Sequence, residues 1–204
     1  MNLVDPEVTK LKLDREIELW HENAELYRRR GWILLARRDN EVDVAFLARL
    51  TLGMQQVPLV VACVRFDFSN YDIWPPALEF IDPYTGEYTA PVVPAVIETE
   101  HGPRNLLIGN HPDTGRPFFC VPGVRQYHTH PQHSGDSWLL HRQGREGALV
   151  TLCDRIWQAM VVNFVGLQLT LTTLPPAAGQ PAELRLQLVS GNVQVLEQAA
   201  GEAA

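Results

Sequence analysis

The chain has 204 residues, of which 46% are hydrophobic and 20% are charged, and 24 acidic residues outnumber 17 basic ones to give a formal charge of −7. This composition indicates a globular domain with one main hydrophobic core, and the negative charge argues against general nucleic-acid binding. The acidic, amphipathic N-terminus lacks the apolar core of a signal peptide, and no apolar run approaches the ~18 residues of a membrane helix. We therefore expect a cytoplasmic protein without a membrane partner.

The first part of the chain predicts a helix followed by a sheet. Apolar side chains recur with roughly a 3.6-residue period between residues 5 and 30, and Asp5-Pro6 is a helix-start signal. After Gly31 the pattern changes to runs rich in Val, Ile, Leu and Phe that are separated by short polar turns. These runs predict an antiparallel meander with strands at 32–39, 41–52, 58–69 and 77–81.

The second part predicts a loop region, a helix and a β extension. Residues 82–118 are rich in proline and glycine and are expected to be mostly turns, whereas residues 144–164 return to helical spacing. The tail has two segments with strand character, 166–174 and 183–197. Ser190-Gly191-Asn192 is a hairpin signal within the second of them.

Together these elements predict an α+β fold. It consists of an N-terminal helix, a four-stranded antiparallel meander, a loop region that carries the site, and a C-terminal helix. This domain is expected to span residues 1–165. Residues 166–204 are expected to form a C-terminal β-hairpin extension that packs on the same domain.

Histidine and cysteine are concentrated in one stretch of the chain. Six of the seven histidines lie between residues 101 and 141, and the stretch FCVPGVRQYHTHPQH (residues 119–133) combines three of them with Cys120. The other two cysteines, Cys63 and Cys153, stand in apolar segments and are expected in the core. The stretch around Cys120 is therefore the candidate site, either as a metal centre or as a reactive thiol.

A zinc site is the first alternative, because thiolate and imidazole are the ligands that Zn²⁺ prefers in tetrahedral sites. If the segment is extended, His128 and His130 project from the same face, as a chelating pair must. Asp136 or His141 would be a further ligand or would orient an imidazole. The predicted metal ligands are Cys120, His128, His130 and His133.

A reactive cysteine is the second alternative. A thiolate is stabilised by a neighbouring positive charge or by a histidine base, and Arg116, Arg125 and the nearby histidines would supply both. Of the three cysteines, only Cys120 is expected in a loop. This alternative requires no cofactor.

The order of several landmarks resembles that of the ubiquitin-conjugating enzymes. In that family a Tyr-Pro…Pro-Pro-x-x-x-Phe segment leads to a His-Pro-Asn turn, a glycine and the catalytic cysteine, and a tryptophan then precedes a helix. The segments YDIWPPALEF (71–80), HPDTGRPFFC (111–120) and ALVTLCDRIWQAM (148–160) occur here in the matching order. The matching residues are Tyr71, Pro75, Pro76, Phe80, His111, Pro112, Gly115, Cys120 and Trp138.

Three departures accompany this resemblance, and one of them is a stretch of about 25 extra residues between the Phe80 strand and His111. Asp113 stands where the family has the Asn of the turn, and an insertion before the tryptophan contains the clustered histidines. The insertion resembles a divergent bacterial group with a Cys-Glu-His-His signature, a predicted metal-binding domain encoded beside ubiquitin-like modifiers and their activating enzymes. Cys120, His128 and His130 fit the signature, but Gln126 occupies the glutamate position.

The resemblance implies that an activating enzyme delivers a ubiquitin-like protein to Cys120 as a thioester, and that the acyl group then passes to an amine of a protein substrate. The base for the amine would be His128 or His130, oriented by Asp113 or Asp136. Two other functions stay open. One is a zinc-binding protein in which Cys120 is a ligand and no acyl group is transferred, and the other is a catalytically silent relative that docks partners.

The sequence YHTHP is also similar to the His-x-His-Pro core of the zinc-dependent JAMM isopeptidases. Position 138, where that family has a serine, is Trp, and the glutamate that precedes the core would have to be Glu79. A JAMM-like zinc isopeptidase is the remaining alternative.

Overall fold

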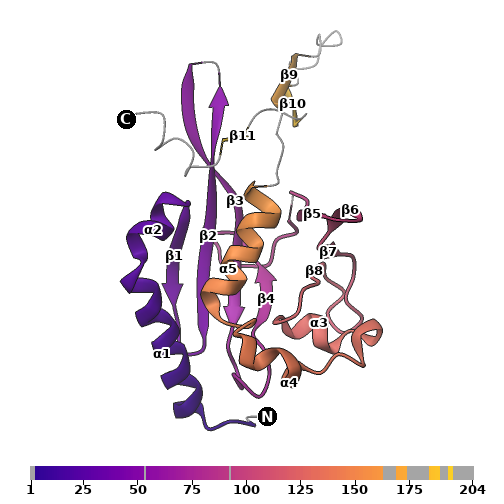
Figure 1. Ribbon diagram of the computed structural model, residues 1–204. Helices are drawn as coiled ribbons and strands as arrows, with labels where there is room; N and C mark the ends of the chain where they lie inside the picture. The colour runs from indigo at the N-terminus through magenta and orange to yellow at the C-terminus, as the bar shows by residue number, and fades with distance from the viewer. Residues whose placement is uncertain are drawn as a thin grey trace.

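The computed structural model has an α+β fold, as the sequence predicts. The N-terminal helices run beside strand β1 of an antiparallel sheet, helix α5 lies in front of the sheet, and a group of small elements lies beyond strand β4 (Figure 1). Among the helices in the described part of the chain, none is long and apolar enough to cross a membrane. The structure describes residues 3–52, 54–91, 93–162, 169–173, 184–188 and 193–194.

The predicted N-terminal helix is present but is divided in two. Helix α1 (Pro6–Glu22) begins where the Asp5 side chain accepts a hydrogen bond from the Glu7 amide (2.9 Å). Asn23 leaves helical geometry, with φ −119° and ψ 17°, and helix α2 (Ala24–Arg29) follows it. An asparagine side chain competes with the helix for backbone hydrogen bonds, which favours a break at this position.

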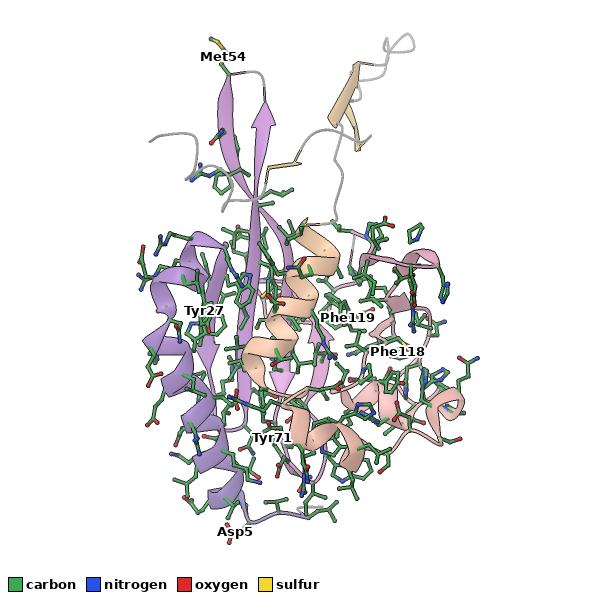
Figure 2. The ribbon with its side chains drawn as sticks, in the orientation of Figure 1. Asp5, Tyr27, Met54, Tyr71, Phe118 and Phe119 are labelled. Carbon is green, nitrogen blue, oxygen red and sulfur yellow. The ribbon has the colours of Figure 1, made fainter. Side chains whose placement is uncertain are left out.

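The predicted meander is confirmed. Its four strands pair in the order β1-β2-β3-β4, and every pair is antiparallel. The β2–β3 hairpin runs far beyond the rest of the sheet and carries the fully exposed Met54 at its tip (Figure 2). The strands are β1 (Trp32–Arg37), β2 (Glu41–Leu52), β3 (Gln55–Asp67) and β4 (Ala77–Phe80).

Helix α5 (Leu149–Trp157) packs on the sheet and closes the core (Figure 1). The predicted helix at 144–164 is confirmed in its central part. Its start is instead a 3₁₀ turn, Arg142–Gly144, followed by Arg145 with a positive φ of 58°, and its end is a π-helical turn, Gln158–Val162. Large buried core residues include Trp32, Phe46, Phe66, Phe68, Leu149, Leu152, Ile156 and Met160.

The start of α5 is held by a residue of α1. Glu16 is 7% exposed, and its carboxylate accepts hydrogen bonds from the Leu149 amide (3.1 Å) and the Arg145 guanidinium (3.3 Å). Ala148, which precedes the helix, has no polar side chain to satisfy the first N–H groups. A carboxylate 133 positions away from Leu149 therefore provides the cap that the local sequence lacks.

Replacing Glu16 with alanine is expected to lower the free energy of unfolding by about 1–3 kcal/mol, because a buried helix amide loses its acceptor. Urea unfolding followed by circular dichroism measures this change. Glu18→Ala, on the exposed side of the same helix, is the matched control and should change the free energy by less than about 0.5 kcal/mol. Equal losses in the two variants would contradict the capping role.

Of two expectations about the middle of the chain, one is confirmed and one is wrong. Residues 82–118 are mostly turns and loops, as predicted, and they also contribute two short antiparallel strand pairs, the second of which ends at Phe119. The segment with His128 and His130 is not extended throughout, because His128 lies in helix α3 (Arg125–Thr129), whereas His130, between α3 and the 3₁₀ turn Pro131–His133, has an extended backbone (φ −74°, ψ 132°). The His128 ring contacts the Asp136 carbonyl, whereas the His130 ring stacks on Phe118, so the expectation of a shared face is wrong. The remaining elements are β5 (Val96–Thr99), β6 (Gly102–Asn105), β7 (Leu107–Ile108), β8 (Phe118–Phe119) and α4 (Trp138–His141).

The C-terminal part forms a β hairpin, but with a pairing that differs from the predicted one. Strand β9 (Leu169–Thr173) pairs with β10 (Leu184–Leu188), whereas β11 (Val193–Gln194) pairs with β2. Strand β2 extends past β1 and offers an edge there, which explains why β11 pairs with it rather than with β10. The predicted turn residues 190–192 lie outside the described residues.

Candidate active site

Cys120 directly follows strand β8 and lines a pocket. Its amide donates to the Leu106 carbonyl (2.8 Å), which continues the β7–β8 pairing by one residue. The side chain is only 5% exposed and faces a pocket of about 340 Å³. The pocket combines apolar walls, such as Ile97 and Leu106, with two arginines, Arg104 and Arg155. Cys120 therefore stands in the wall of a pocket whose lining is both apolar and cationic.

His133 is the histidine that the fold brings to the thiol. The distance from Cys120 Sγ to His133 Nε2 is 3.3 Å, which allows a hydrogen bond to sulfur. The imidazole stacks on the Tyr127 ring, with 3.9 Å between the centroids and 20° between the planes. The 3₁₀ turn after α3 thus returns the chain to Cys120. The sequence named His133 as a metal ligand and, with the other nearby histidines, as a possible partner of the thiol, but it assigned the general-base role to His128 or His130.

The surroundings keep both members of this pair neutral near pH 7. Burial raises the pKa of the Cys120 thiol, and the positive charge of Arg104 offsets this only in part. Burial lowers the pKa of the His133 imidazole, and the neighbouring His130 lowers it further. A neutral imidazole nitrogen beside a protonated thiol is a proton acceptor, so His133 is suited to accept the thiol proton.

His128 and His130 have other contacts. His128 Nε2 accepts a hydrogen bond from the Gly123 amide (3.4 Å), so its Nδ1 is the nitrogen that donates to the Asp136 carbonyl (2.9 Å). His128 thereby ties the loop after Cys120 to the segment after the 3₁₀ turn. His130 stacks on Phe118 with 5.3 Å between the ring centroids. The general-base role predicted for these two histidines stays a prediction.

The four predicted zinc ligands do not converge in this fold. Cys120 pairs with His133, whereas His128 and His130 are directed to the groups named above. Within the described ranges, no group of three or more His, Cys, Asp and Glu side chains is arranged to hold a metal ion. Tetrahedral zinc requires four converging donors, so this donor set as folded does not fit the ion. Zinc binding stays an untested prediction.

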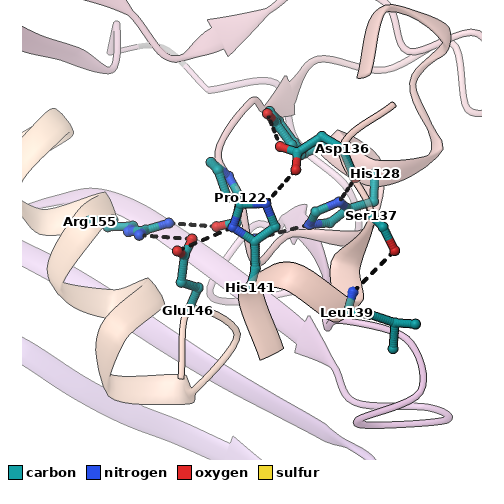
Figure 3. A network of polar contacts seen from close by, with 10 residues as sticks. Pro122, His128, Asp136, Ser137, Leu139, His141, Glu146 and Arg155 are labelled. Atoms are coloured by element: carbon teal, nitrogen blue, oxygen red, sulfur yellow. Dashed lines mark hydrogen bonds and ion pairs between the residues drawn. The ribbon is translucent and has the colours of Figure 1, made fainter. Parts of the chain in front are cut away.

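Asp136, predicted as an orienting carboxylate, lies at the centre of a network of polar contacts (Figure 3). One carboxylate oxygen accepts a hydrogen bond from the Tyr127 hydroxyl (2.7 Å), and the other lies 2.6 Å from Nε2 of His141 on α4. Nδ1 of His141 lies 3.2 Å from a Glu146 carboxylate oxygen, and the second oxygen of Glu146 pairs with Arg155 on α5 (3.2 Å). The network therefore joins α3 to α5.

The charges in this network reinforce one another. The hydrogen bond from His141 lowers the pKa of Asp136, and the same bond raises the pKa of His141. Burial, with the Asp136 hydrogen bond, raises the pKa of Tyr127 to about 12. Near neutral pH, Asp136 is therefore a carboxylate, His141 is biased towards imidazolium, and Tyr127 stays a protonated donor.

Gln126 and Asp113 are the two positions that depart from the ubiquitin-conjugating resemblance. The Gln126 side chain donates to the Leu78 carbonyl (3.0 Å) and accepts from the Leu78 amide (3.2 Å), which fastens α3 to β4. A glutamate at this position would accept but not donate, so a structural role suits glutamine. The Asp113 side chain is 73% exposed, while its amide donates to the buried His111 (3.2 Å).

Two glycines allow the loop after Cys120 to pack against the turn before α5. Gly123 has a φ of +93°, and a Cβ atom there would lie 2.3 Å from the Glu146 carbonyl oxygen. A Cβ atom on Gly147 would lie 2.8 Å from the Trp138 ring. The two backbone segments are therefore in direct contact, at positions where only glycine fits.

Comparison with known proteins assigns the chain to a family. Residues 4–114 and 95–165 match the Y4jH family, described as Y4jH-like. The chain belongs to the Y4jH family. A relative from Sinorhizobium fredii (strain NBRC 101917 / NGR234), the "Uncharacterized protein y4jH", is 32% identical over 176 residues, which are 76% of this chain and 83% of the relative. The residues matched to the Y4jH family include every side chain of the site described above. The resemblance to ubiquitin-conjugating enzymes is accordingly a hypothesis about a Y4jH family member.

Three residues of the network were not predicted: Tyr127, Glu146 and Arg155. Tyr127 stands inside the histidine-rich stretch, so its place beside His128 was an available signal. Glu146 and Arg155 follow the stretch and show no shared spacing with it. Only the tertiary contact between the turn before α5 and the helix itself brings them together.

Proposed function

We propose that this Y4jH family member is a cytosolic acyl carrier of the ubiquitin-conjugating type. It would receive the C-terminal acyl group of a ubiquitin-like protein on Cys120 from an activating enzyme and pass it to an amine of a protein substrate. The proposal rests mainly on the 3.3 Å contact between Cys120 Sγ and His133 Nε2 beside a pocket. A thiol next to a neutral imidazole is the arrangement of a histidine-assisted nucleophile.

The order of the elements supports the proposal. Helix α1, the antiparallel meander, the loop with Cys120 and helix α5 follow one another as in the ubiquitin-conjugating resemblance. Two of the residues that carry the resemblance also hold this region together. His111 contacts the Gln126 carbonyl (3.0 Å), and the Trp138 indole donates to the Asp72 carbonyl (2.9 Å). Fold analogy alone does not assign chemistry, so the thiol–imidazole pair remains the basis.

The proposed transfer has two steps. First, Cys120 Sγ bonds to the acyl carbon of the delivered thioester, the bond from that carbon to the delivering sulfur breaks, and the thiol proton passes through His133 to the leaving thiolate. Second, the substrate amine bonds to the same carbon, the bond to Cys120 breaks, and an amine proton passes through His133 to the Cys120 thiolate. His133 takes the base role that the sequence suggested for His128 or His130, because it contacts the sulfur.

A peptide that ends in a glycine thioester of mercaptoethanesulfonate tests the proposal. Glycine is chosen because a sulfur on a residue only 5% exposed leaves little room for a side chain. The untagged full chain is expected to gain the mass of the peptide acyl group on Cys120, to lose it to dithiothreitol, and to transfer it to free lysine as an amide. Cys120→Ala should abolish the adduct. Cys63→Ala, which removes a buried cysteine of 4% exposure, should retain it.

Two outcomes would overturn the proposal. One is the absence of a Cys120 adduct between about pH 7 and pH 9, where the thiolate fraction rises, or an adduct on Cys63 instead. The other is the presence of one zinc ion per untagged chain that is lost in Cys120→Ala, as metal analysis of the same preparations would detect. That second result would favour the zinc-binding function.

A further inference from the structure

A continuous series of contacts leads from helix α5 back to the thiol. Each step is a hydrogen bond, an ion pair or a ring stack, and the longest is the 3.9 Å stack of Tyr127 on His133. Figure 3 shows the steps from Arg155 through Glu146 and His141 to Asp136. In order from α5, the series comprises Arg155, Glu146, His141, Asp136, Tyr127, His133 and Cys120.

Both ends of this series meet at the same pocket. Arg155 lines the pocket together with Cys120, and its Nη1 donates to the Pro122 carbonyl (2.5 Å), two residues after the cysteine. The contacts therefore close a ring around the loop that carries the thiol. A substitution at any residue of this ring can therefore alter the position of the Cys120 sulfur through the contacts that follow it.

Asp136 is the best anchored member of the series. Its side chain holds Tyr127 on one side and His141 on the other. Its amide donates to the His133 carbonyl (2.9 Å), and its own carbonyl accepts from His128 (2.9 Å). Backbone and side chain thus both connect this residue to the histidines near Cys120.

We propose that Asp136 is the positioning residue of the site. By binding the Tyr127 hydroxyl, it fixes the ring on which His133 stacks and so keeps the imidazole against Cys120. His141 and Glu146 hold the Asp136 carboxylate in this orientation from the side of α5. The role in acyl transfer rests on the proposed function, whereas the effect on thiol reactivity does not.

The test measures the alkylation rate of Cys120 by iodoacetamide against pH, on the full chain with mass-spectrometric assignment. The charged and titratable groups that face His133 are His130, Asp136 and Arg104, besides Cys120 and the stacked Tyr127. With His133 in place, the rate in the neutral range should exceed what the small thiolate fraction alone allows. Without it, the logarithm of the rate should rise by about one for each pH unit, because only the thiolate then reacts.

Two variants isolate the positioning contact. Tyr127→Phe keeps the ring stack and removes the hydroxyl, and Asp136→Asn keeps the shape and removes the charge. Each is expected to lower the rate near pH 7 by about tenfold and to give the steeper pH profile. The alkylation rate of the double variant should be no lower than that of the slower single variant, because both changes act on the same contact. Glu98→Gln, an exposed carboxylate beside the pocket residue Ile97, is the charge-matched control and should keep the wild-type profile.

Wild-type pH profiles in both Tyr127→Phe and Asp136→Asn would overturn the positioning role. If Asp136→Asn fails to fold, as thermal melting by circular dichroism would reveal, Tyr127→Phe alone decides the question. Thioester formation with the glycine-ended peptide is measured in parallel. A changed alkylation profile in a protein whose wild type forms no thioester would contradict the acyl-carrier function while supporting the positioning role.

Discussion

Replacing His133 with asparagine is expected to reduce the alkylation rate of Cys120 near pH 7 by about 100-fold. Burial raises the pKa of this thiol, so little thiolate is present at neutral pH, and the wild-type reaction depends on proton transfer to the imidazole. Below the lowered pKa of His133 the imidazole is protonated and cannot accept the proton. Above the pKa of the thiol, the ionised sulfur reacts without help. The alkylation rates of the wild type and of His133→Asn should therefore differ between these two pKa values and become equal at high pH.

The His130→Asn variant tests whether His133 is the base for the Cys120 thiol, or whether His130 has this role, as the sequence suggested. His130 stacks on Phe118 rather than on Tyr127, so its loss should change the rate near pH 7 by less than about threefold. The same iodoacetamide assay measures both variants. A loss in His130→Asn that equals or exceeds the loss in His133→Asn would contradict the assignment of His133 as the base.

Replacing Gly123 with alanine is expected to lower the free energy of unfolding by about 3 kcal/mol or more. Alanine at a φ of +93° is strained by about 1–3 kcal/mol. The added Cβ would also lie 2.3 Å from the Glu146 carbonyl oxygen, so the backbone of the loop or of the turn must move. Urea unfolding followed by circular dichroism measures the loss.

Gly102→Ala is the matched control for this prediction. Gly102 has a similar φ of +97°, but no heavy atom of the described residues lies within 4 Å of a Cβ built there. The free energy of unfolding of Gly102→Ala should therefore decrease only by the backbone strain, about 1–3 kcal/mol. The excess loss in Gly123→Ala then measures the close contact between the two backbone segments. Equal decreases in the free energy of unfolding of the two variants would show that the backbone at Gly123 moves to accommodate the Cβ atom without further loss of stability.

The sheet was predictable from local signals, because strands rich in Val, Ile, Leu and Phe were separated by recognisable turns. Strand β2 spans Glu41–Leu52, as predicted, whereas β3 begins three residues earlier than predicted, at Gln55. The tail was less predictable. The partner of β11 is the extended edge of β2, and no local pattern reports which distant edge is unpaired.

In the candidate site, the sequence identified Cys120 and the histidine cluster but not the histidine that pairs with the sulfur. The five-residue helix α3 is too short to produce a helical period. It depends on tertiary contacts such as those of Arg125, which donates to the Pro75 carbonyl (3.1 Å) and the Ser69 carbonyl (2.6 Å). Because this helix turns the chain, His133 rather than His128 or His130 reaches Cys120.

The cap that Glu16 places on α5 links the opening of two helices that are far apart in the sequence. When α1 detaches, the Leu149 amide loses its acceptor, so its hydrogen exchange should report the detachment of α1 rather than fraying of α5 itself. Arg155, on the same helix, holds the loop behind Cys120 through the Pro122 carbonyl. The lifetime of the assembled pocket is therefore expected to be set in part by the first helix of the chain.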